Sequence, residues 1–408
     1  MILDIIDKKR LGKELSYKEL YSLFNGYLNG DVYDYQMSAF LMAVCINGMT
    51  DEEVFALTKI FIDSGDSLDL SCIPGIKVDK HSTGGIGDKT TFVVASIVAS
   101  LGVPIIKMCG RGLGYTGGTI DKLESIKGYR VNLNEKEIIK QVNDINIVIT
   151  GQTANLVPMD KMIYALRDVT ATVKSIPLIA SSIMSKKIAS GADKILIDIK
   201  VGNGALIKNK TEAKELSDLM VKIGEIYDRE VRCVITDMNT PLGYSVGNSL
   251  EVLEAMDVLK GKETDNNFVK LCIDVSSEIV SMGLNISIDE ARSMVLETIN
   301  NKSAYNKFLE LIEYQKGDIN SIEVSKKKYE IKANKSGILT GINALEIGKL
   351  SLELGAGKKN LKDKIDYTVG IRLNKLVDSK VKKGDVLAVL YVKDKVPTIN
   401  IDDIFTII

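Results

Sequence analysis

The chain has few of the residues that usually build metal centres and disulfide frameworks. It contains one histidine, His81, so a metal site with several histidine ligands is excluded. Its five cysteines are scattered and form no CxxC pair, which argues against a structural zinc site or a disulfide framework and favours reduced thiols. We therefore expect a cytoplasmic protein.

The sequence also lacks a dominant sign of charge and a long apolar segment. Its 53 basic and 54 acidic side chains nearly cancel, so no global field attracts nucleic acid or an anionic membrane. The longest uncharged run, residues 90–106, is shorter than the roughly 20 residues of a membrane span and contains Gly102 and Pro104. The start, MILDIIDKKR, has bases after its apolar run, the reverse of a signal peptide. We expect a soluble protein that binds no nucleic acid and no membrane.

The chain of 408 residues, 45% of them apolar, can form two or three packed domains. Its first segment reads as short helices, because the capping-box pairs Ser16 with Glu19 and Thr50 with Glu53 precede helical apolar spacings. From about residue 77 the sequence pattern changes to short apolar runs rich in β-branched residues, which lie between glycine-rich turns. Examples are FVVASIVA, VPIIKM and INIVIT. This alternation indicates an α/β sheet.

Residues 158–190 again show a helical sequence pattern, and KILIDIKVG, which follows, is predicted to be another buried strand. After residue 321, the runs GILTGINA, YTVGIRL and DVLAVLYV alternate like antiparallel strands. We predict the class α/β, with a helical lobe (1–65, completed by 158–190), a mixed-sheet α/β lobe (66–157 and 191–321) and a β-rich C-terminal domain (322–408).

Two glycine-rich loops carry the residue types that a phosphate dianion needs, namely backbone N–H groups, cations and hydroxyls. The loop DKHSTGG supplies Lys80, Ser82, Gly84 and Gly85, and CGRGLGYTGGT supplies more glycines and Thr119. Each loop alone could equally be a tight turn in which glycine provides a positive φ. GLGYTG matches the dinucleotide motif GxGxxG only weakly, and GGIGDKTT fails the spacing of a nucleotide-triphosphate loop.

A third segment, YALRDVTATVKSIPLIASSIMSKK, is predicted to form two helices, the second with Pro177 in its first turn. Tyr164 and Arg167 share one face of the first helix, and Ser182 and Lys186 share one face of the second. Taken alone, these cations could simply cover a solvated face.

In combination, DKHSTGG, GRGLGYTGGTIDKLES and YALRD…SIPLIASSIMSKK occur in the order and spacing of the pyrimidine nucleoside phosphorylase and thymidine phosphorylase family, which nearly the whole chain resembles. The resemblance implies a helical lobe, an α/β lobe that holds phosphate, a cleft that closes by hinge motion, and a homodimer through the helical lobe. It implies reversible phosphorolysis of uridine, thymidine and deoxyuridine by inorganic phosphate, giving the free base and (deoxy)ribose 1-phosphate without an organic cofactor.

The resemblance also assigns roles to individual positions. The phosphate-binding residues would be Lys80, Ser82, Gly84, Gly85, Thr91, Cys109 and Thr119. The nucleoside-binding residues would be His81, Lys107, Tyr164, Arg167, Ser182 and Lys186. Of these, His81, Arg167 and Lys186 are the catalytic candidates, because donors and cations at the base stabilise the anionic leaving pyrimidine more than the neutral nucleoside.

Three positions bear on how closely the chain follows this pattern. Cys109 stands where the family usually has serine, and Tyr115 where it usually has histidine. Lys107 resembles the branch that accepts uridine, whereas strict thymidine phosphorylases tend to have methionine there. The alternatives are therefore a strict thymidine phosphorylase or a catalytically silent binder of nucleoside or phosphate. An anthranilate phosphoribosyltransferase, a relative in fold, would need metal-binding acids and a different base pocket.

Members of the uridine-accepting branch bind a potassium ion with carbonyls and a carboxylate. The matching positions are Gly87, Lys89, Leu242, Ser245 and Glu254, with Lys89 in place of a small or hydroxylic residue. We hypothesise that the Lys89 ammonium fills the ion's place and pairs with Glu254. In the alternative, Lys89 is solvated and potassium is retained.

Overall fold

The computed structural model describes residues 2–112, 114–115, 117–152, 155–359, 362–394 and 396–408. Leu113 and Thr116 of the GLGYTG stretch lie outside these ranges. The chain divides into two compact units, which are described separately. Unit 1 comprises Met1–Cys72, Thr153–Ile195 and Asn209–Cys233, and unit 2 comprises Ile73–Gln152, Leu196–Lys208 and Val234–Ile408.

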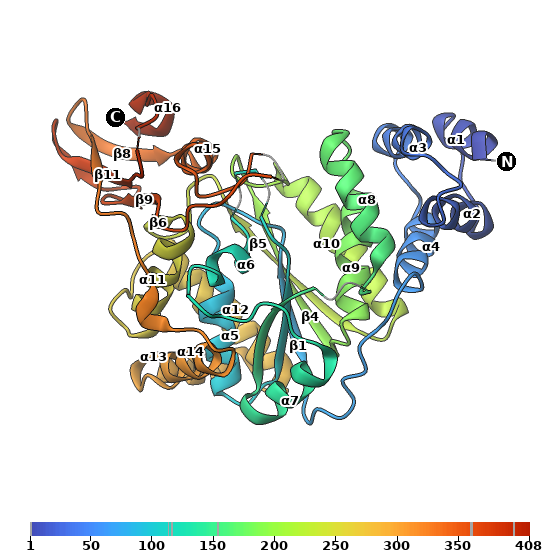
Figure 1. Cartoon of the computed structure of the whole chain (residues 1–408), viewed down its shortest axis with the longest axis horizontal. Helices are drawn as coiled ribbons and strands as arrows, with labels where there is room; N and C mark the ends of the chain where they lie inside the picture. The colour runs from blue at the N-terminus through green and yellow to red at the C-terminus, as the bar shows by residue number, and fades with distance from the viewer. Residues whose placement is uncertain (1, 113, 116, 153–154, 360–361, 395) are drawn as a thin grey trace. The chain divides into compact units, whose positions relative to one another are not determined.

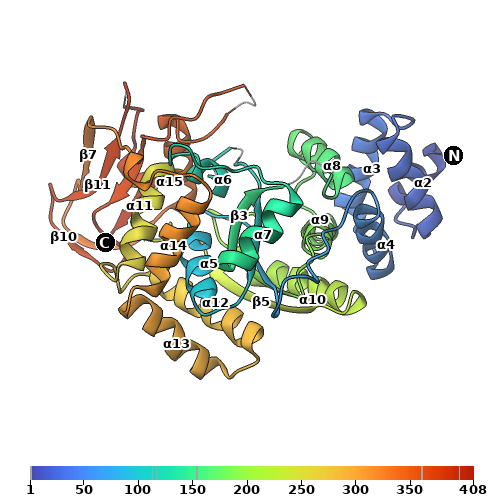
Figure 2. The ribbon, with the colours of Figure 1, turned by 60° about the horizontal axis from the view of Figure 1, so that its bottom comes forward.

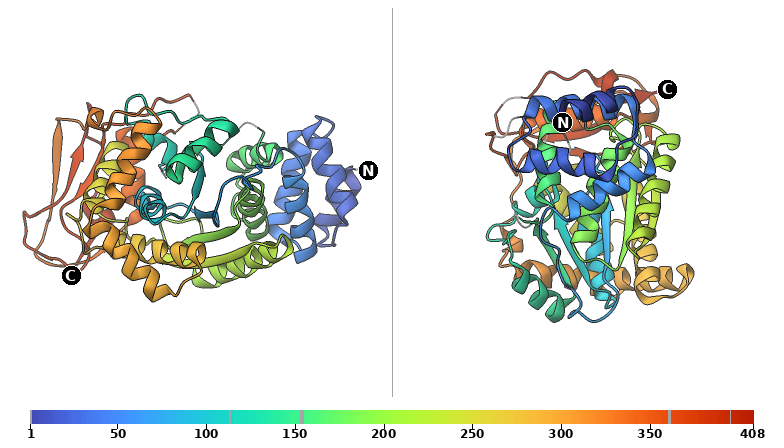
Figure 3. Two further views of the ribbon diagram at one scale, coloured as in Figure 1. Left: turned by 90° about the horizontal axis from the view of Figure 1, so that it is seen from below. Right: turned by 90° about the vertical axis from the view of Figure 1, so that its right-hand side faces the viewer.

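Unit 1 is built from helices. They are α1 (Ile2–Arg10), α2 (Tyr17–Leu28), α3 (Asp34–Asn47), α4 (Asp51–Ile62), α8 (Pro158–Val169), α9 (Ile176–Ala189) and α10 (Lys210–Ile226). Both predicted capping boxes are confirmed, with Ser16 and Glu19 at α2 and Thr50 and Glu53 at α4. The N-terminus lies at the outer edge of the bundle, on the side away from α9 (Figures 1 and 3).

The core of unit 1 joins segments that are far apart in the sequence. Helix α4 packs on α9, and α9 packs on α10. Between the first helices, the ring of Phe24 meets Phe40 and Phe61 edge to face, with centroid distances of 5.7 and 5.6 Å. This geometry is favourable for buried aromatic pairs, so α2, α3 and α4 are held as one body.

The predicted strands of the α/β region are present with one exception. Strands β2 (Ile105–Cys109) and β3 (Ile147–Gly151) form a parallel pair, and β1 (Val78–Ser82), β4 (Lys194–Val201) and β5 (Glu230–Asp237) form a sheet in the order β1-β4-β5. The strand expected at FVVASIVA is wrong, because this run lies in helix α5 (Thr90–Ser100). Helix α5 is buried on nearly every side (Figures 1 and 2), so its sequence is apolar all round and shows no helical period.

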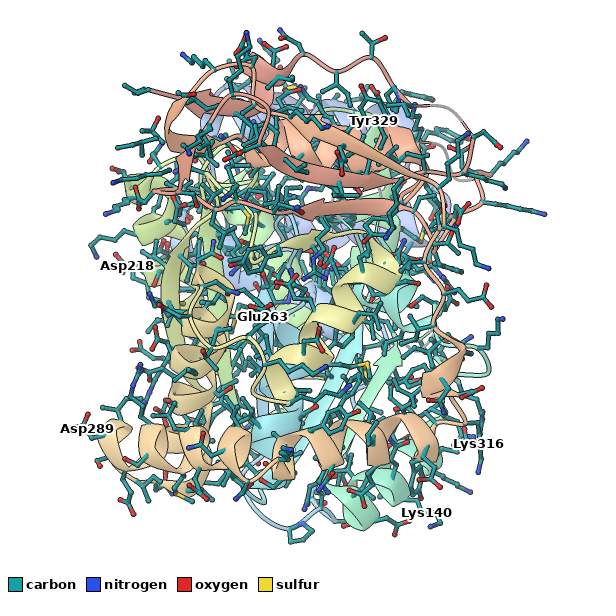
Figure 4. All side chains as sticks on the ribbon, turned by 90° about the vertical axis from the view of Figure 1, so that its left-hand side faces the viewer. Lys140, Asp218, Glu263, Asp289, Lys316 and Tyr329 are labelled. Atoms are coloured by element: carbon teal, nitrogen blue, oxygen red, sulfur yellow. The ribbon has the colours of Figure 1, made fainter. Side chains whose placement is uncertain are left out.

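The layer around α5 consists of further helices of unit 2. They are α11 (Asn248–Leu259), α12 (Asn267–Leu284), α13 (Ile288–Asn300) and α14 (Ser303–Tyr314). Asp289 at the start of α13 and Lys316 just after α14 lie at opposite ends of this layer, and Lys140 of α7 (Glu135–Ile145) lies near the Lys316 end (Figure 4). The short helix α6 (Thr119–Leu123) follows the second glycine-rich loop.

The C-terminal segment forms the predicted antiparallel strands in two sheets. One sheet has the order β6-β9-β11-β7, with β6 (Ser245–Val246), β9 (Gly370–Leu373), β11 (Val386–Tyr391) and β7 (Lys328–Lys332). The other has the order β10-β8-β12, with β10 (Lys380–Val381), β8 (Gly337–Ile342) and β12 (Phe405–Ile407). Helices α15 (Ala344–Leu354) and α16 (Ile401–Ile404) accompany them. Strand β6 lies much earlier in the chain than its sheet partners, since Ser245 pairs with Arg372 and Val246 with Ile371.

The structure confirms the predicted α/β class with a helical N-terminal bundle and a β-rich C-terminal part. In the described ranges no single helix is both long and apolar enough to cross a membrane. Helices α12 and α13 meet that criterion only as a pair, and a bend of 117° separates them.

Candidate functional site

The first predicted phosphate loop connects strand β1 to helix α5 in unit 2. Lys80 is almost fully buried, and its Nζ donates to Oγ1 of Thr90 at 2.6 Å. The Thr90 hydroxyl in turn donates to Oδ1 of Asp88 at 2.6 Å, and the Ser82 hydroxyl donates to Oδ2 of Asp88 at 2.5 Å. The turn thus closes a hydrogen-bond network on one carboxylate, which orients both hydroxyl groups.

Asp88 remains ionised within this network. Burial favours the neutral carboxyl, but the ammonium groups of Lys80 and Lys200, with the hydrogen bonds from Ser82 and Thr90, hold the pKa of Asp88 well below its ordinary value. The carboxylate is therefore a fixed acceptor at the base of the loop.

A second carboxylate, Asp198, also lies near Lys80. Its Oδ2 is 2.6 Å from Nζ of Lys200 and 3.7 Å from Nζ of Lys80, and its Oδ1 accepts from the Thr236 hydroxyl at 2.6 Å. Asp198 and Lys200 are two residues apart on β4, so their side chains lie on the same face, and both are completely buried. Charges buried this deeply are tolerated only when they are paired, so Lys80, Lys200, Asp88 and Asp198 form a mutually dependent set.

The two glycines of the loop are needed for different reasons. Gly84 has a φ of 91°, in the region that favours glycine, and its N–H donates to Oγ of Ser82 at 3.2 Å. A Cβ at Gly85 would lie 2.4 Å from Cε of Met238, so a side chain there would require the Met238 side chain to shift. A positive φ therefore explains glycine at position 84 but not at position 85.

The remaining predicted phosphate ligands begin or end neighbouring elements of unit 2. Thr91 is buried in the first turn of α5, where the N-terminal N–H groups of the helix favour an anion. Cys109 is buried at the end of β2, and Thr119 is half-buried at the start of α6.

Two predicted nucleoside residues also lie in unit 2, on or beside β1. His81 is half-buried between Lys80 and Ser82 on that strand. The Lys107 ammonium, from β2, donates to the backbone carbonyl of Lys80 at 2.5 Å and lies 3.7 Å from Oδ1 of Asp79. Lys107 therefore fixes the backbone on which His81 is carried.

The residues predicted for the base lie on α8 and α9 in unit 1. Arg167 is 1% exposed, and its guanidinium donates to the carbonyls of Thr172, Val173 and Leu178 at 3.2, 2.8 and 3.1 Å. Burial lowers the pKa of Arg167 from its ordinary value. The ring of Tyr164 lies 5.8 Å from the guanidinium carbon.

Ser182 and Lys186 lie on one face of α9, as their spacing of four residues predicts, and Lys186 contacts Asp160 and Tyr164. Nζ of Lys186 donates to Oγ of Ser182 at 2.8 Å and to Oδ2 of Asp160, and it lies 5.9 Å from the centroid of the Tyr164 ring. Oδ1 of Asp160 is buried and has no hydrogen-bond partner within the part of the chain that is described. Unit 1 thus brings the predicted base-binding residues together around Tyr164.

The predicted cation residues also come together. Lys89 is 1% exposed, so it is not solvated, and its ammonium contacts the carbonyls of Gly87, Leu242 and Ser245 and the carboxylate of Glu254. Elsewhere among the described residues, no group of three or more histidine, cysteine, aspartate or glutamate side chains is placed to bind a metal ion.

Sequence reasoning missed several charged residues of the site. They are Asp88, Lys122, Asp160, Asp198, Lys200 and Glu251. Asp198 and Lys200 had a detectable signal, because two charges on one face of the otherwise apolar strand KILIDIKV must be paired or functional. Asp160 is one helical turn before Tyr164, which is also a readable spacing.

Comparison with protein families assigns nearly the whole chain. Residues 3–65 match the helical bundle domain of the glycosyl transferase family, and residues 75–305 match the α/β domain of the same family. Residues 338–404 match the pyrimidine nucleoside phosphorylase C-terminal domain. The fold and these matches define a glycosyl transferase with an additional C-terminal domain.

Similar curated proteins carry a more specific name. The chain is 48% identical to a pyrimidine-nucleoside phosphorylase of Staphylococcus haemolyticus (strain JCSC1435), across 99% of this chain and 94% of the relative. It is 47% identical to that of Bacillus subtilis (strain 168), with the same coverage, and 48% identical to that of Geobacillus stearothermophilus, across 96% and 92%. The chain therefore belongs to the pyrimidine nucleoside phosphorylase family, as its motifs predict.

Among solved structures, the fold resembles that of anthranilate phosphoribosyltransferase from Thermus thermophilus. The TM-score is 0.60 and the sequence identity 15%, and the match covers 76% of this chain and 99% of the other. At this identity the likeness concerns the fold alone. It agrees with the relationship in fold that the sequence predicts.

Proposed function

We propose that the protein catalyses the reversible phosphorolysis of pyrimidine nucleosides to the free base and (deoxy)ribose 1-phosphate. The main support is the identity of 48% with a pyrimidine-nucleoside phosphorylase across 99% of the chain. The two groups of side chains agree with this reaction, because one supplies hydroxyls, backbone N–H groups and a lysine for phosphate, and the other supplies cations for a leaving base.

The proposed chemistry is a displacement at C1′ of the sugar. An oxygen of phosphate forms a bond to C1′ while the C1′–N1 bond breaks, and the electron pair of that bond moves onto the pyrimidine. Phosphate would be held by Lys80, by N–H groups at Gly84 and Gly85, and by Ser82, Thr91, Cys109 and Thr119. An enzyme that holds phosphate in line with the C1′–N1 bond removes much of the entropic barrier to this displacement.

The leaving base becomes anionic as the bond breaks, so cations beside it stabilise the transition state more than the bound nucleoside. We assign this task to Arg167 and Lys186, with Ser182 as a donor, Tyr164 along the base and His81 donating to the base carbonyl next to N1. The three carbonyls around Arg167 hold its guanidinium in place, while each terminal nitrogen keeps a second N–H for a ligand.

We propose uridine, thymidine and deoxyuridine as substrates and expect no organic cofactor. Lys107 supports acceptance of uridine, because a lysine near the ribose 2′-hydroxyl can donate to it. A strict thymidine phosphorylase is the alternative within the same reaction. Cys109 and Tyr115 motivate the other alternative, a silent binder, since a thiol is a weaker donor than a hydroxyl and a phenol does not titrate near neutrality.

We further propose a homodimer formed through the helical lobe. On α3, Tyr35, Met42 and Ile46 are 70, 39 and 75% exposed, and their spacing puts them on one face. A second copy that covers this face would bury it. We expect the sedimentation coefficient of the wild type to be that of a dimer and Ile46→Glu to produce monomers, and a monomeric wild type would contradict the proposal.

We also propose a cytoplasmic location, because the five cysteines are scattered along the sequence and form no CxxC pair, a pattern that favours reduced thiols. Fractionation of cells with an antibody to the protein tests this. Recovery in the cytosolic fraction would support it, and recovery outside the cytoplasm would contradict it.

The test of function is release of free base from uridine or thymidine, with and without inorganic phosphate. Phosphate-dependent release from both nucleosides is the expected result, and release from thymidine alone would indicate the strict enzyme. Lys80→Met is the control for contaminating activity, because it removes the phosphate cation. Release from neither nucleoside would favour the silent binder, and Cys109→Ser with Tyr115→His would then be the variant to assay.

A further inference from the structure

The Lys89 ammonium occupies a cradle built from two distant parts of unit 2. Its Nζ donates to the carbonyls of Gly87, Leu242 and Ser245 at 3.1, 2.6 and 3.0 Å, and it is 3.0 Å from Oε2 of Glu254. It also lies 4.7 Å from the centroid of the Phe268 ring. Oxygen dipoles, a carboxylate and an aromatic face all attract one positive charge at this point.

The cradle requires a cation to be stable. Glu254 is 6% exposed, and its two oxygens accept the N–H groups of Tyr244 and Ser245, both at 2.7 Å. These bonds fix the carboxylate beside three carbonyls that point at the same place. Without a positive charge, a buried carboxylate and several carbonyl oxygens would face one another unpaired, which is strongly unfavourable.

The residues that could hold potassium therefore do not fit a free ion in this chain. The lysine nitrogen takes the position to which the oxygens converge, and a second cation there would meet the ammonium at short range. The Gly87 backbone also packs close to these oxygens, since a Cβ there would lie 2.8 Å from the Leu242 carbonyl oxygen and 3.2 Å from that of Ser245. The cradle accommodates one cation.

A second lysine holds the next carbonyl of the same turn. Nζ of Lys122 donates to the carbonyl of Asp88 at 2.7 Å and pairs with Glu251 at 2.8 Å. Glu251 and Glu254 lie on α11, so the carbonyls of Gly87 and Asp88 are each tied to that helix by a buried lysine. Lys89 is also the residue immediately before α5, which begins with Thr90 and Thr91. A cation at Lys89 therefore fixes the turn that presents Ser82, Asp88 and Thr90.

We propose that Lys89 is the built-in monovalent cation of this loop, so that the protein works without free potassium, and that removing the lysine side chain opens a potassium site. Lys89 is a positioning residue, because it acts through the loop and not on the reacting atoms. The inference rests on the proposed function only for its kinetic readout.

The wild type is tested first, after dialysis into potassium-free buffer. Activity and melting temperature are measured in potassium, sodium and choline chloride at equal ionic strength. We expect kcat/KM to change by less than about twofold, since an unchanged transition state leaves this ratio unchanged. We also expect the melting temperature to be the same in all three salts. A specific potassium-dependent rise in either quantity would overturn the proposal.

Two variants then separate the charge from the space that it fills. Lys89→Ser empties the cradle, so potassium should raise its melting temperature in a saturable way, because a ligand that binds only the folded state stabilises it. Potassium should also raise its activity by about tenfold or more, the size of effect typical when a group that supports a site from behind is removed or restored. Lys89→Met fills the same space with an uncharged chain and should respond to potassium in neither measurement.

A Lys89→Ser variant that is fully active and equally stable in choline chloride would contradict the inference. If Lys89→Ser does not fold, the comparison of the wild type in the three salts is sufficient to test the proposal, because that comparison needs no substitution. If the wild type releases no base in any salt, the proposed function fails, whereas the melting temperatures still decide whether Lys89 replaces the ion.

Discussion

In the predicted phosphate loop of unit 2 and its surroundings, the buried ammonium groups face carboxylates, whereas in unit 1 the Arg167 guanidinium is held by carbonyl oxygens. Lys80 and Lys200 are balanced by Asp88 and Asp198, so this set carries no net charge before a ligand binds. The three carbonyls around Arg167 are neutral dipoles, and the nearby carboxylate of Asp160 acts on the guanidinium only through its charge and without a direct ion pair.

The difference suggests a division of tasks between the two groups. A neutral, fully paired set holds the loop backbone and its N–H groups in a fixed position, because the Ser82 and Thr90 hydroxyls both donate to Asp88. A guanidinium held by dipoles keeps its full charge available for the negative charge that develops on a leaving base. We therefore expect substitutions of the paired residues Asp88 and Lys200 to reduce mainly stability, and those at Arg167 to reduce mainly catalysis.

The largest effect is expected for Arg167→Met. Loss of the charge beside the base should lower kcat by about a hundredfold to a thousandfold, the range measured when one preorganised transition-state contact is removed. Arg167→Lys keeps the charge but loses the planar guanidinium that donates to three carbonyls. Its kcat should therefore lie between that of the wild type and that of Arg167→Met. Steady-state kinetics with saturating phosphate measures this. A change confined to KM would show that Arg167 stabilises substrate and transition state equally.

The next effect concerns Lys200. Lys200→Met leaves Asp198 buried without its closest cation, which should lower the free energy of unfolding by about 3 kcal/mol. Lys214→Met is the matched control, because Lys214 pairs with Asp218 at the surface with 73% of its side chain exposed. Urea unfolding of the three proteins measures the difference. Equal urea midpoints for Lys200→Met and Lys214→Met would contradict the view that the paired charges of unit 2 serve mainly stability.

A third prediction uses the pH dependence of Asp88. Because its pKa is held well below the ordinary value of 3.8, the unfolded chain binds this proton first as the pH falls. The stability that the carboxylate contributes is therefore complete above about pH 4 and is lost as the pH falls below that value. Asp88→Asn should be less stable than the wild type at pH 6, and the gap should narrow below pH 4. A gap that is constant with pH in urea titrations would contradict the assignment.

The smallest effect is expected for Cys109→Ser. A hydroxyl is a stronger donor than a thiol, so the apparent KM for phosphate should fall by about threefold, the size of one modest hydrogen bond. Phosphate titration at saturating nucleoside measures this, and the KM for nucleoside serves as the internal control. An unchanged or higher KM for phosphate would remove Cys109 from the ligands.

The fold was largely predictable, because its elements carry local signals. Capping boxes mark α2 and α4, and alternating apolar residues mark the C-terminal strands. The run FVVASIVA was assigned wrongly for a physical reason. A helix surrounded by α11, α12 and α14 needs apolar residues on all faces, and this removes the period that separates a helix from a buried strand.

The site was predictable in its residue types but not in its pairings. The chemistry of phosphate selects Lys80 and Ser82 from the sequence, yet nothing local shows that the Ser82 hydroxyl donates to Asp88. The contact of Lys89 with Leu242 and Glu254 joins residues far apart in the chain, so only the resemblance to a family suggested it. Pairing of this kind depends on tertiary structure, which composition and spacing do not encode.

Strand β6 has a consequence for the order in which the protein can mature during synthesis. Ser245, whose carbonyl contacts Lys89, is paired in the sheet with Arg372, and Val246 is paired with Ile371. The ribosome makes the phosphate loop early but makes its supporting strand more than a hundred residues after Ser245. A nascent chain therefore braces the cradle around Lys89 only after β9 has been made, and a product terminated before β9 would carry all the proposed catalytic residues without a properly braced loop.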